Sequence, residues 1–237
     1  MTYFAGFVSA VPAANKQAYK GFADDSVEMF KSYGATRLVD TWEDDVNSGT
    51  VTDFRRAVQA KPDEKIVFSW QEFTDKAAAD AANTKMNADP RMKDMGAKMP
   101  FDGARMIYGS FDALYDHGTG GKAGYFDGSL LPVKTARKAD YLAQLKRQAA
   151  IFDELGATRF VDAWGDMVPD GKLTDFKKAV NAAADETVVF SFLEWPSKTV
   201  RDAAWEKLMN DPRMMEDNSP GDEKRRVFGG FVPLLDV

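Results

Sequence analysis

Hydrophobic and polar residues follow two different periods along the chain, and the same succession of periods occurs twice. Residues 3–11 are rich in aromatic and β-compatible side chains and stop at Pro12, which predicts a first strand. A helical period then runs up to Gly34, and glycine suits the left-handed cap that ends a helix. The apolar positions of this predicted helix are Tyr19, Phe22, Ala23, Val27, Phe30 and Tyr33.

The remaining elements of the first copy are three strands and a second helix. Residues 36–46 alternate as a strand does, and residues 66–70 form a short apolar run typical of another strand. Residues 75–87 are rich in alanine and predict a helix, and residues 106–111 predict the closing strand. The order β-α-β-β-α-β is that of a ferredoxin-like domain, so the predicted fold class is α+β.

The whole pattern is a tandem duplication. Trp42 recurs as Trp164, 122 positions later, and roughly four in ten aligned positions are identical before a two-residue deletion. Repeated segments include 34–37 with 156–159, 52–54 with 174–176, and 89–92 with 211–214. A period above 100 residues is a whole domain, so we expect domains at 1–115 and 125–237, joined by a glycine-rich linker at 116–124.

Both faces of each predicted sheet need to be covered. The third strand carries Phe68 and Trp70 in one register and Val67 and Phe73 in the other. Two helices cover one face, and packing the two sheets against each other covers the second. We therefore predict an intrachain dimeric α/β-barrel with pseudo-twofold symmetry and a cavity between its sheets. In solution it would be a monomer or a further homodimer. The connection that begins a short helix at Thr52, Asp53 and Phe54 is expected to fold over this cavity.

The composition excludes several chemistries. The chain has 237 residues, no cysteine, one histidine and a net charge of -6. Disulfides, thiolate nucleophiles and cysteine-ligated metals are therefore excluded. His117 lies in the glycine-rich segment and is expected to be a solvated linker residue, so we predict no metal site.

Partners and cofactors are limited in the same way. Basic residues are scattered among acidic ones, which gives no footprint for nucleic acid. The sequence shows no membrane-spanning apolar run and no leader, so we expect a cytoplasmic protein without membrane partners. It also lacks a phosphate-binding loop and a dinucleotide fingerprint, and we predict no cofactor.

Four segments of the first copy resemble a known family. Residues 51–54, 63–70, 89–92 and 99–109 are similar to the YbaA-like family, a domain of unknown function (DUF1428). The resemblance implies a dimeric α/β-barrel whose members are normally single domains that pair with themselves, so this chain would be a fused pair. It implies no activity. The second copy departs from the family pattern after Met214, where residues 218–225 replace residues 98–105 and lose the Met-Pro-Phe sequence.

Polar residues on predicted core strands of both copies are the candidates for chemistry, because burying a charge is costly unless something offsets it. The candidate catalytic residues are Asp40, Glu72, Tyr108, Asp162 and Glu194. The candidate ligand-binding residues are Trp42, Trp70, Met99, Phe101, Arg105 and Trp164. Asp40 and Glu72 would form a paired-carboxylate acid–base device. Alternatively, both carboxylates satisfy arginines such as Arg37 or Arg105 in structural ion pairs.

Three classes of function follow from these residues. The first is a small-molecule-binding protein that holds an apolar or aromatic ligand in the inter-sheet cavity. The second, by fold analogy, is a cofactor-independent isomerase or monooxygenase that uses Asp40, Glu72 and Tyr108. The third is a structural or assembly module. The sequence change in the second copy predicts an asymmetric site, with residues 99–105 of the first copy at its edge.

Overall fold

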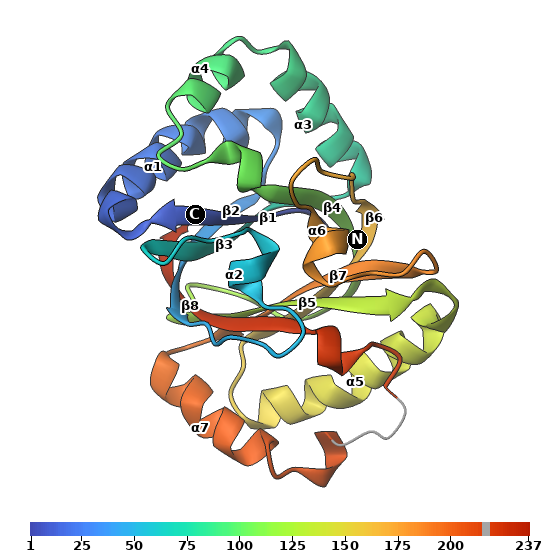
Figure 1. The fold of residues 1–237 in the computed structure, drawn as a ribbon. Helices are drawn as coiled ribbons and strands as arrows, with labels where there is room; N and C mark the ends of the chain where they lie inside the picture. The colour runs from blue at the N-terminus through green and yellow to red at the C-terminus, as the bar shows by residue number, and fades with distance from the viewer. Residues whose placement is uncertain (215–218) are drawn as a thin grey trace.

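A computed structural model describes residues 1–214 and 219–237 of the chain, and these form two α+β halves around one sheet (Figure 1). The strands are β1 (Tyr3–Pro12), β2 (Arg37–Asp45), β3 (Glu64–Phe73), β4 (Ile107–Gly118), β5 (Tyr125–Lys134), β6 (Arg159–Met167), β7 (Glu186–Trp195) and β8 (Val227–Asp236). The α-helices are α1 (Lys16–Tyr33), α2 (Phe54–Ala57), α3 (Lys76–Ala88), α4 (Arg91–Ala97), α5 (Lys138–Glu154), α6 (Phe176–Ala179) and α7 (Lys198–Leu208). Short 3₁₀ turns lie at Ala13–Asn15, Gly103–Arg105, Thr135–Arg137, Pro212–Met214 and Glu223–Arg225.

The strands close into a single antiparallel barrel in the order β1-β3-β2-β8-β5-β7-β6-β4. Each half contributes four neighbouring strands in the ferredoxin-like order, and the halves join where β2 pairs with β8 and β4 pairs with β6. Closure leaves no free strand edge. The predicted α+β dimeric barrel, made within one chain, is therefore confirmed.

Helices cover the outside of the barrel on two opposite sides. Figure 1 shows α1, α3 and α4 on the side of the first copy and α5 and α7 on the side of the second. Gly34 ends α1 with a φ of 125°, in the region that favours glycine, as its position in the sequence predicts. No helix within the described ranges is long and apolar enough to cross a bilayer.

Aromatic side chains fill the inside of the barrel. Phe68 of the first copy stacks on Phe190 of the second at a ring-centroid distance of 4.5 Å, and Trp70 stacks on Phe192 at 4.1 Å. All four are buried. These large inward-pointing rings occupy the space between the sheets in which the sequence predicts a ligand cavity.

The short helices α2 and α6 lie at one end of the barrel. Asp53 caps α2 by accepting a hydrogen bond from the Arg56 amide, as the sequence predicts. Phe54 from α2 and Phe176 from α6 are fully buried in the aromatic core. The Thr52 hydroxyl donates to the Ala179 carbonyl oxygen at 2.6 Å, so each copy closes the barrel with a segment bonded to the other.

The connection between the copies begins later than expected. Strand β4 continues to Gly118 and pairs His117 with Phe160 of β6. The His117 ring stacks on Tyr115, and its Nε2 lies 2.7 Å from Asp153 Oδ2. His117 is therefore a strand residue and not a linker residue, although its side chain is 42% exposed, as expected of a solvated histidine.

Candidate functional site

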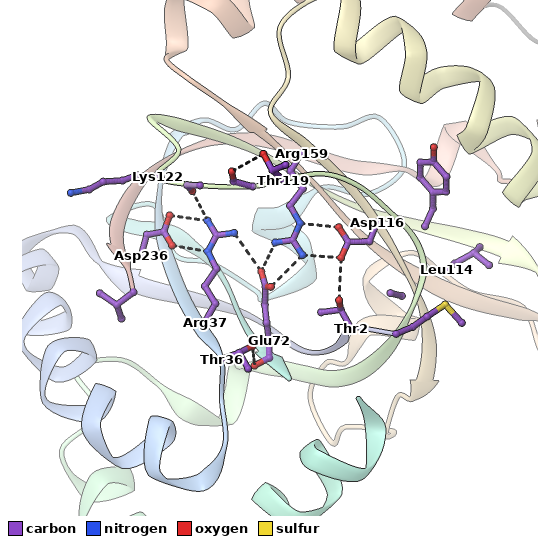
Figure 2. A pocket seen from close by; sticks show the side chains of 17 residues that line it. Thr2, Thr36, Arg37, Glu72, Leu114, Asp116, Thr119, Lys122, Arg159 and Asp236 are labelled. Atoms are coloured by element: carbon purple, nitrogen blue, oxygen red, sulfur yellow. Dashed lines mark hydrogen bonds and ion pairs between the residues drawn. The ribbon is translucent and has the colours of Figure 1, made fainter. Parts of the chain in front are cut away.

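An open depression of about 990 Å³, lined by several charged groups, lies at the mouth of the barrel (Figure 2). Arg37 and Arg159, which are equivalent in the two copies, point toward Glu72 there. Arg159 donates to Glu72 at 2.7 Å, and Arg37 donates to Glu194 at 2.6 Å, so each arginine binds the glutamate of the other copy. We call these four residues the mouth network.

Two aspartates also bind the arginines of the mouth network. Asp236 accepts from Arg37 at 2.7 Å and Asp116 accepts from Arg159 at 2.8 Å. Burial raises the pKa of Glu194, although the hydrogen bond from Arg37 opposes this shift. Carboxylates therefore satisfy both guanidinium groups, while Lys122 also lines the depression. The alternative hypothesis that Glu72 pairs with Arg37 is confirmed for this carboxylate, at 3.5 Å.

The second hollow is a cavity of about 390 Å³ between the outer face of the copy-two sheet and helices α5 and α7. We call it the copy-two cavity. Its apolar wall includes Leu145, Phe152, Phe160, Leu193, Trp205 and Phe228. Its polar wall includes Asp127, Ser129, Tyr141, Gln144, Asp162 and Ser191. A mostly apolar wall with a few convergent polar groups is typical of a small-molecule site.

Asp162 is the central polar group of the copy-two cavity and is 2% exposed. Its Oδ1 accepts one hydrogen bond from the Tyr141 hydroxyl and one from the Ser191 hydroxyl, both at 2.6 Å. Burial raises the pKa of Asp162 to about 6, although the hydrogen bonds from Ser191 and Tyr141 lower it. The other carboxylate oxygen, Oδ2, has no hydrogen-bond partner among the described residues.

Gln144 also carries a buried oxygen without a hydrogen-bond partner among the described residues. The residue is 5% exposed, and the unpaired oxygen is its Oε1. Buried polar atoms are nearly always paired, because desolvation of an unpaired one costs about 1–3 kcal/mol. No other buried side-chain polar atom in the described parts of the chain lacks a partner, and both of these belong to residues of the copy-two cavity.

The remaining charged residues of the cavity wall are paired. Asp127 accepts from Arg201 Nε at 2.8 Å and from the indole nitrogens of Trp195 and Trp205 at the same distance. Arg226 donates to Glu223 at 2.6 Å. Burial raises the pKa of Asp127, and the charge of Arg201 opposes the rise. Asp162 is therefore the carboxylate of this wall without a cation in contact.

The first copy has the same aspartate and tyrosine, but its hollow of about 580 Å³ lies between α1 and the segment of α4, and neither Asp40 nor Tyr19 lines it. Tyr19 donates to Asp40 at 2.6 Å. Phe101 packs against Tyr19 and Phe22, with ring centroids 5.7 and 6.3 Å apart.

The second copy replaces those aromatic side chains with smaller or polar ones. By the repeat, Gln144 stands in the second copy where Phe22 stands in the first, and Gly221 stands where Phe101 does. Further along the same wall, Ser129 replaces Phe7 and Arg226 replaces Met106. The predicted asymmetry is present, but the cavity lies in the second copy and not at residues 99–105 of the first.

The paired-carboxylate device of Asp40 and Glu72 is not formed. In the β2–β3 pairing Asp40 lies opposite Ser69, while Glu72 lies opposite Arg37. Ser69 and Glu72 are an odd number of residues apart, so their side chains leave opposite faces of the sheet. Asp40 and Asp162 lie outside the barrel under the helices, whereas Glu72 and Glu194 lie at its mouth.

Most predicted ligand-binding residues pack in the protein core or form structural pairs. Trp70 stacks inside the barrel. Trp42 and Trp164 lie outside it under Lys16 and Lys138, with each ammonium 5.0–5.3 Å from the ring centroid.

The others lie in the first copy. Arg105 forms a buried bidentate ion pair with Glu64, in which both nitrogen–oxygen distances are 2.7 Å. Tyr108 is 55% exposed on β4. Met99 and Phe101 are half-buried, Phe101 among aromatic rings. Of the eleven predicted site residues, only Asp162 lines the copy-two cavity.

Sequence reasoning missed the partners of Asp162. Tyr141 and its equivalent Tyr19 occur at apolar positions of the predicted helices, where a tyrosine is indistinguishable from core. Ser191 is a small polar residue on the third strand of the second copy, which by itself gives no signal of a site. The usable signal is Gln144, because it places an amide in the helical stripe where the first copy has Phe22.

Comparisons with known proteins agree with the repeat and with the barrel. A family described as "Protein of unknown function (DUF1428)" matches residues 2–103 and again residues 124–223. The uncharacterized protein YbaA of Escherichia coli strain K12 is 53% identical over 116 residues, which make up 49% of this chain and 99% of that protein.

Solved structures with the same architecture are more distant in sequence. A candidate monooxygenase from Lactobacillus acidophilus NCFM has a TM-score of 0.60 at 11% identity and covers 100% of this chain and 95% of its own. An anthrone oxidase-like protein has a TM-score of 0.56 at 13% identity and covers 100% of this chain and 92% of its own. At these identities the likeness shows a shared fold alone.

Proposed function

The chain belongs to the DUF1428 family, in two tandem copies, and from its cavity we propose that it binds a small aromatic or apolar molecule in the second copy. The family description names no activity, so the proposal rests on the geometry. The observation that carries it is the pair of unpartnered buried atoms, Asp162 Oδ2 and Gln144 Oε1, in the wall of a cavity whose surface is mostly apolar. A ligand with a polar end would satisfy both atoms and fill the space between the rings.

The cavity has a suitable size for this role. Small-molecule sites usually enclose about 300–1,000 Å³, and the copy-two cavity is near the lower limit at about 390 Å³. The proposal departs from the inter-sheet site expected from the sequence, since the aromatic stack occupies that space. The ligand class, apolar or aromatic, is unchanged.

The direct test combines native mass spectrometry of the purified chain with ligand-observed NMR, using benzyl alcohol and indole as probes. Gln144→Phe introduces the copy-one residue and should fill the cavity, so probe binding should be lost. Asp40→Asn is the matched control in the first copy and should leave binding unchanged. Equal probe binding by wild type and the folded Gln144→Phe variant would contradict the proposal.

Acid–base catalysis without a cofactor is the second candidate function. It is favoured by Asp162, because a carboxyl group with a pKa of about 6 can both accept and donate a proton near neutral pH. The names of the two structural neighbours concern oxidation, but at 11% and 13% identity they support the fold and not this chemistry. The test is incubation of the protein with a co-purified ligand in deuterated water. Acid–base catalysis by Asp162 predicts that the ligand incorporates deuterium with wild type and not with Asp162→Asn.

A further inference from the structure

The charges in the copy-two cavity narrow the class of ligand. Resting on the proposed function, we propose that the cavity selects a protonated amine on an aromatic body, with the ammonium group bound to Asp162 Oδ2 and Gln144 Oε1. Phenethylamine is the simplest molecule of this class. Three properties of the cavity wall favour this class: its hydrogen-bonding capacity, a carboxylate with no cation bonded to it in the described residues, and its aromatic rings.

The hydrogen-bonding capacity at Asp162 is limited to acceptors. Tyr141 and Ser191 each have one hydroxyl proton, and both protons are donated to Asp162 Oδ1. The atoms left unpaired are Asp162 Oδ2 and Gln144 Oε1, which both accept. A ligand group that pairs with both must carry at least two donor hydrogens. An ammonium group carries three, whereas a hydroxyl group carries one.

Among the described residues Asp162 also has no cation bonded to it, although the nearby charge of Arg226 lowers its pKa. The groups packed around its carboxylate are the Tyr141 hydroxyl from α5, the Ser191 hydroxyl from β7, and the Arg226–Glu223 ion pair next to β8. The hydroxyls are neutral, and the positive charge of Arg226 is bonded to Glu223. An anionic ligand would therefore be repelled by the desolvated carboxylate of Asp162. A cationic ligand would instead be the first cation bonded to that carboxylate.

Aromatic rings complete the site. Phe152 and Phe160 lie 4.9 Å apart between ring centroids, and Trp205 and Phe228 lie 5.1 Å apart. All four line the cavity. The faces of such rings attract a cation by about 0.5–2 kcal/mol and also cover the apolar body of the ligand.

The test is isothermal titration of the full chain with three probes that share a phenylethyl body: phenethylamine, 2-phenylethanol and 3-phenylpropanoate. We expect the amine to bind about tenfold or more tightly than the alcohol, as for a hydrogen bond to a charged group, and the anion to bind most weakly. In Asp162→Asn the amine should lose this advantage while alcohol binding is unchanged. Asp40→Asn, with the same tyrosine partner in the first copy, should bind all three as wild type does.

A measurement on the unmodified chain keeps the test independent of any variant's folding. Amine affinity should fall as the pH drops below about 6, where Asp162 gains a proton, while alcohol affinity stays flat. Equal affinity for amine and alcohol, or tighter binding of the anion, would overturn the inference and leave the proposed function standing. Absence of binding by all three probes, together with benzyl alcohol and indole, would overturn both.

Discussion

Tyr141 donates its hydroxyl proton to Asp162 at 2.6 Å, and Tyr19 donates to Asp40 at the same distance in the other copy. The pair is thus a feature of the repeat, retained under the helices on both sides of the barrel. Only the second copy adds a cavity beside it among the described hollows. Two equivalent carboxylates therefore serve as test and control for each other.

The raised pKa of Asp162 predicts a pH dependence of stability. An unfolded aspartate has a pKa of about 3.9, and the folded value is about 6, so the folded state binds the proton more tightly. Between these values the folded chain carries more protons than the unfolded one, and stability falls as the pH rises. The free energy of unfolding falls by on the order of 3 kcal/mol in total, and this loss is complete above about pH 6.

Urea unfolding of wild type and Asp162→Asn at pH 4.5 and pH 7.5 measures this effect. The substituted asparagine cannot ionise, so the variant lacks this loss. The free energy of unfolding of Asp162→Asn, relative to that of wild type, should therefore be higher at pH 7.5 than at pH 4.5. Asp40→Asn should show the same sign, because burial also raises the pKa of Asp40. A difference between wild type and Asp162→Asn that is independent of pH would contradict the prediction.

The mouth network predicts a large cost for breaking one ion pair. Arg159→Met removes the cation that binds Glu72 at 2.7 Å and Asp116 at 2.8 Å. Removing one partner of a buried ion pair costs about 3–5 kcal/mol. The only other arginine bonded to Glu72 in the described residues is Arg37, at 3.5 Å, so the denaturation midpoint should fall markedly. Lys20→Met is the control, since its exposed pair with Asp24 contributes under about 1 kcal/mol. Similar small losses in both variants would show that the network does not hold the copies together.

The aromatic stack predicts a second large loss. Phe190 is fully buried and stacks on Phe68 across the barrel at 4.5 Å. Phe190→Ala removes the ring and leaves a void between the sheets, which should cost about 3–5 kcal/mol by urea unfolding. Phe190→Leu keeps most of the volume and should cost clearly less. Equal losses for both substitutions would indicate that the void is not the cause.

The sequence predicts the fold well because the repeat and the periodicities are local properties. Alternation in residues 36–46 and the glycine at Gly34 each specify one element, and the duplication checks each element twice. The bulk of Phe68 and Trp70 also argues for two sheets packed together. The same bulk occupies the space between them, a consequence that requires the partner rings Phe190 and Phe192 to be placed.

The candidate site was less accessible because it depends on register and on side-chain volume. Asp40 and Glu72 are both polar strand residues, but only the β2–β3 register shows that they lie on opposite faces. The sequence places residues 99–105 of the first copy at the edge of the predicted site. In the structure Phe101 fills the equivalent space in the first copy, so its replacement by Gly221 accompanies an open cavity.

The first copy should acquire a second site when its aromatic filling is removed. Phe22→Gln with Phe101→Gly introduces the copy-two residues beside Tyr19 and Asp40, whose hydrogen bond already matches that of the second copy. Phenethylamine should then bind with a stoichiometry of two instead of one in isothermal titration. The double variant should lose stability, because two rings leave the core beneath α1.

Each binding site of the double variant can be assigned to its carboxylate by adding one further substitution at a time. Asp40→Asn in the double-variant background should return the stoichiometry to one, with the affinity of the remaining site equal to that of wild type. Asp162→Asn in the same background should instead leave the new copy-one site as the tighter one. A folded double variant that still binds a single amine would show that Phe22 and Phe101 do not account for the asymmetry, and that the wider exchange of Phe7 for Ser129 and Met106 for Arg226 is required.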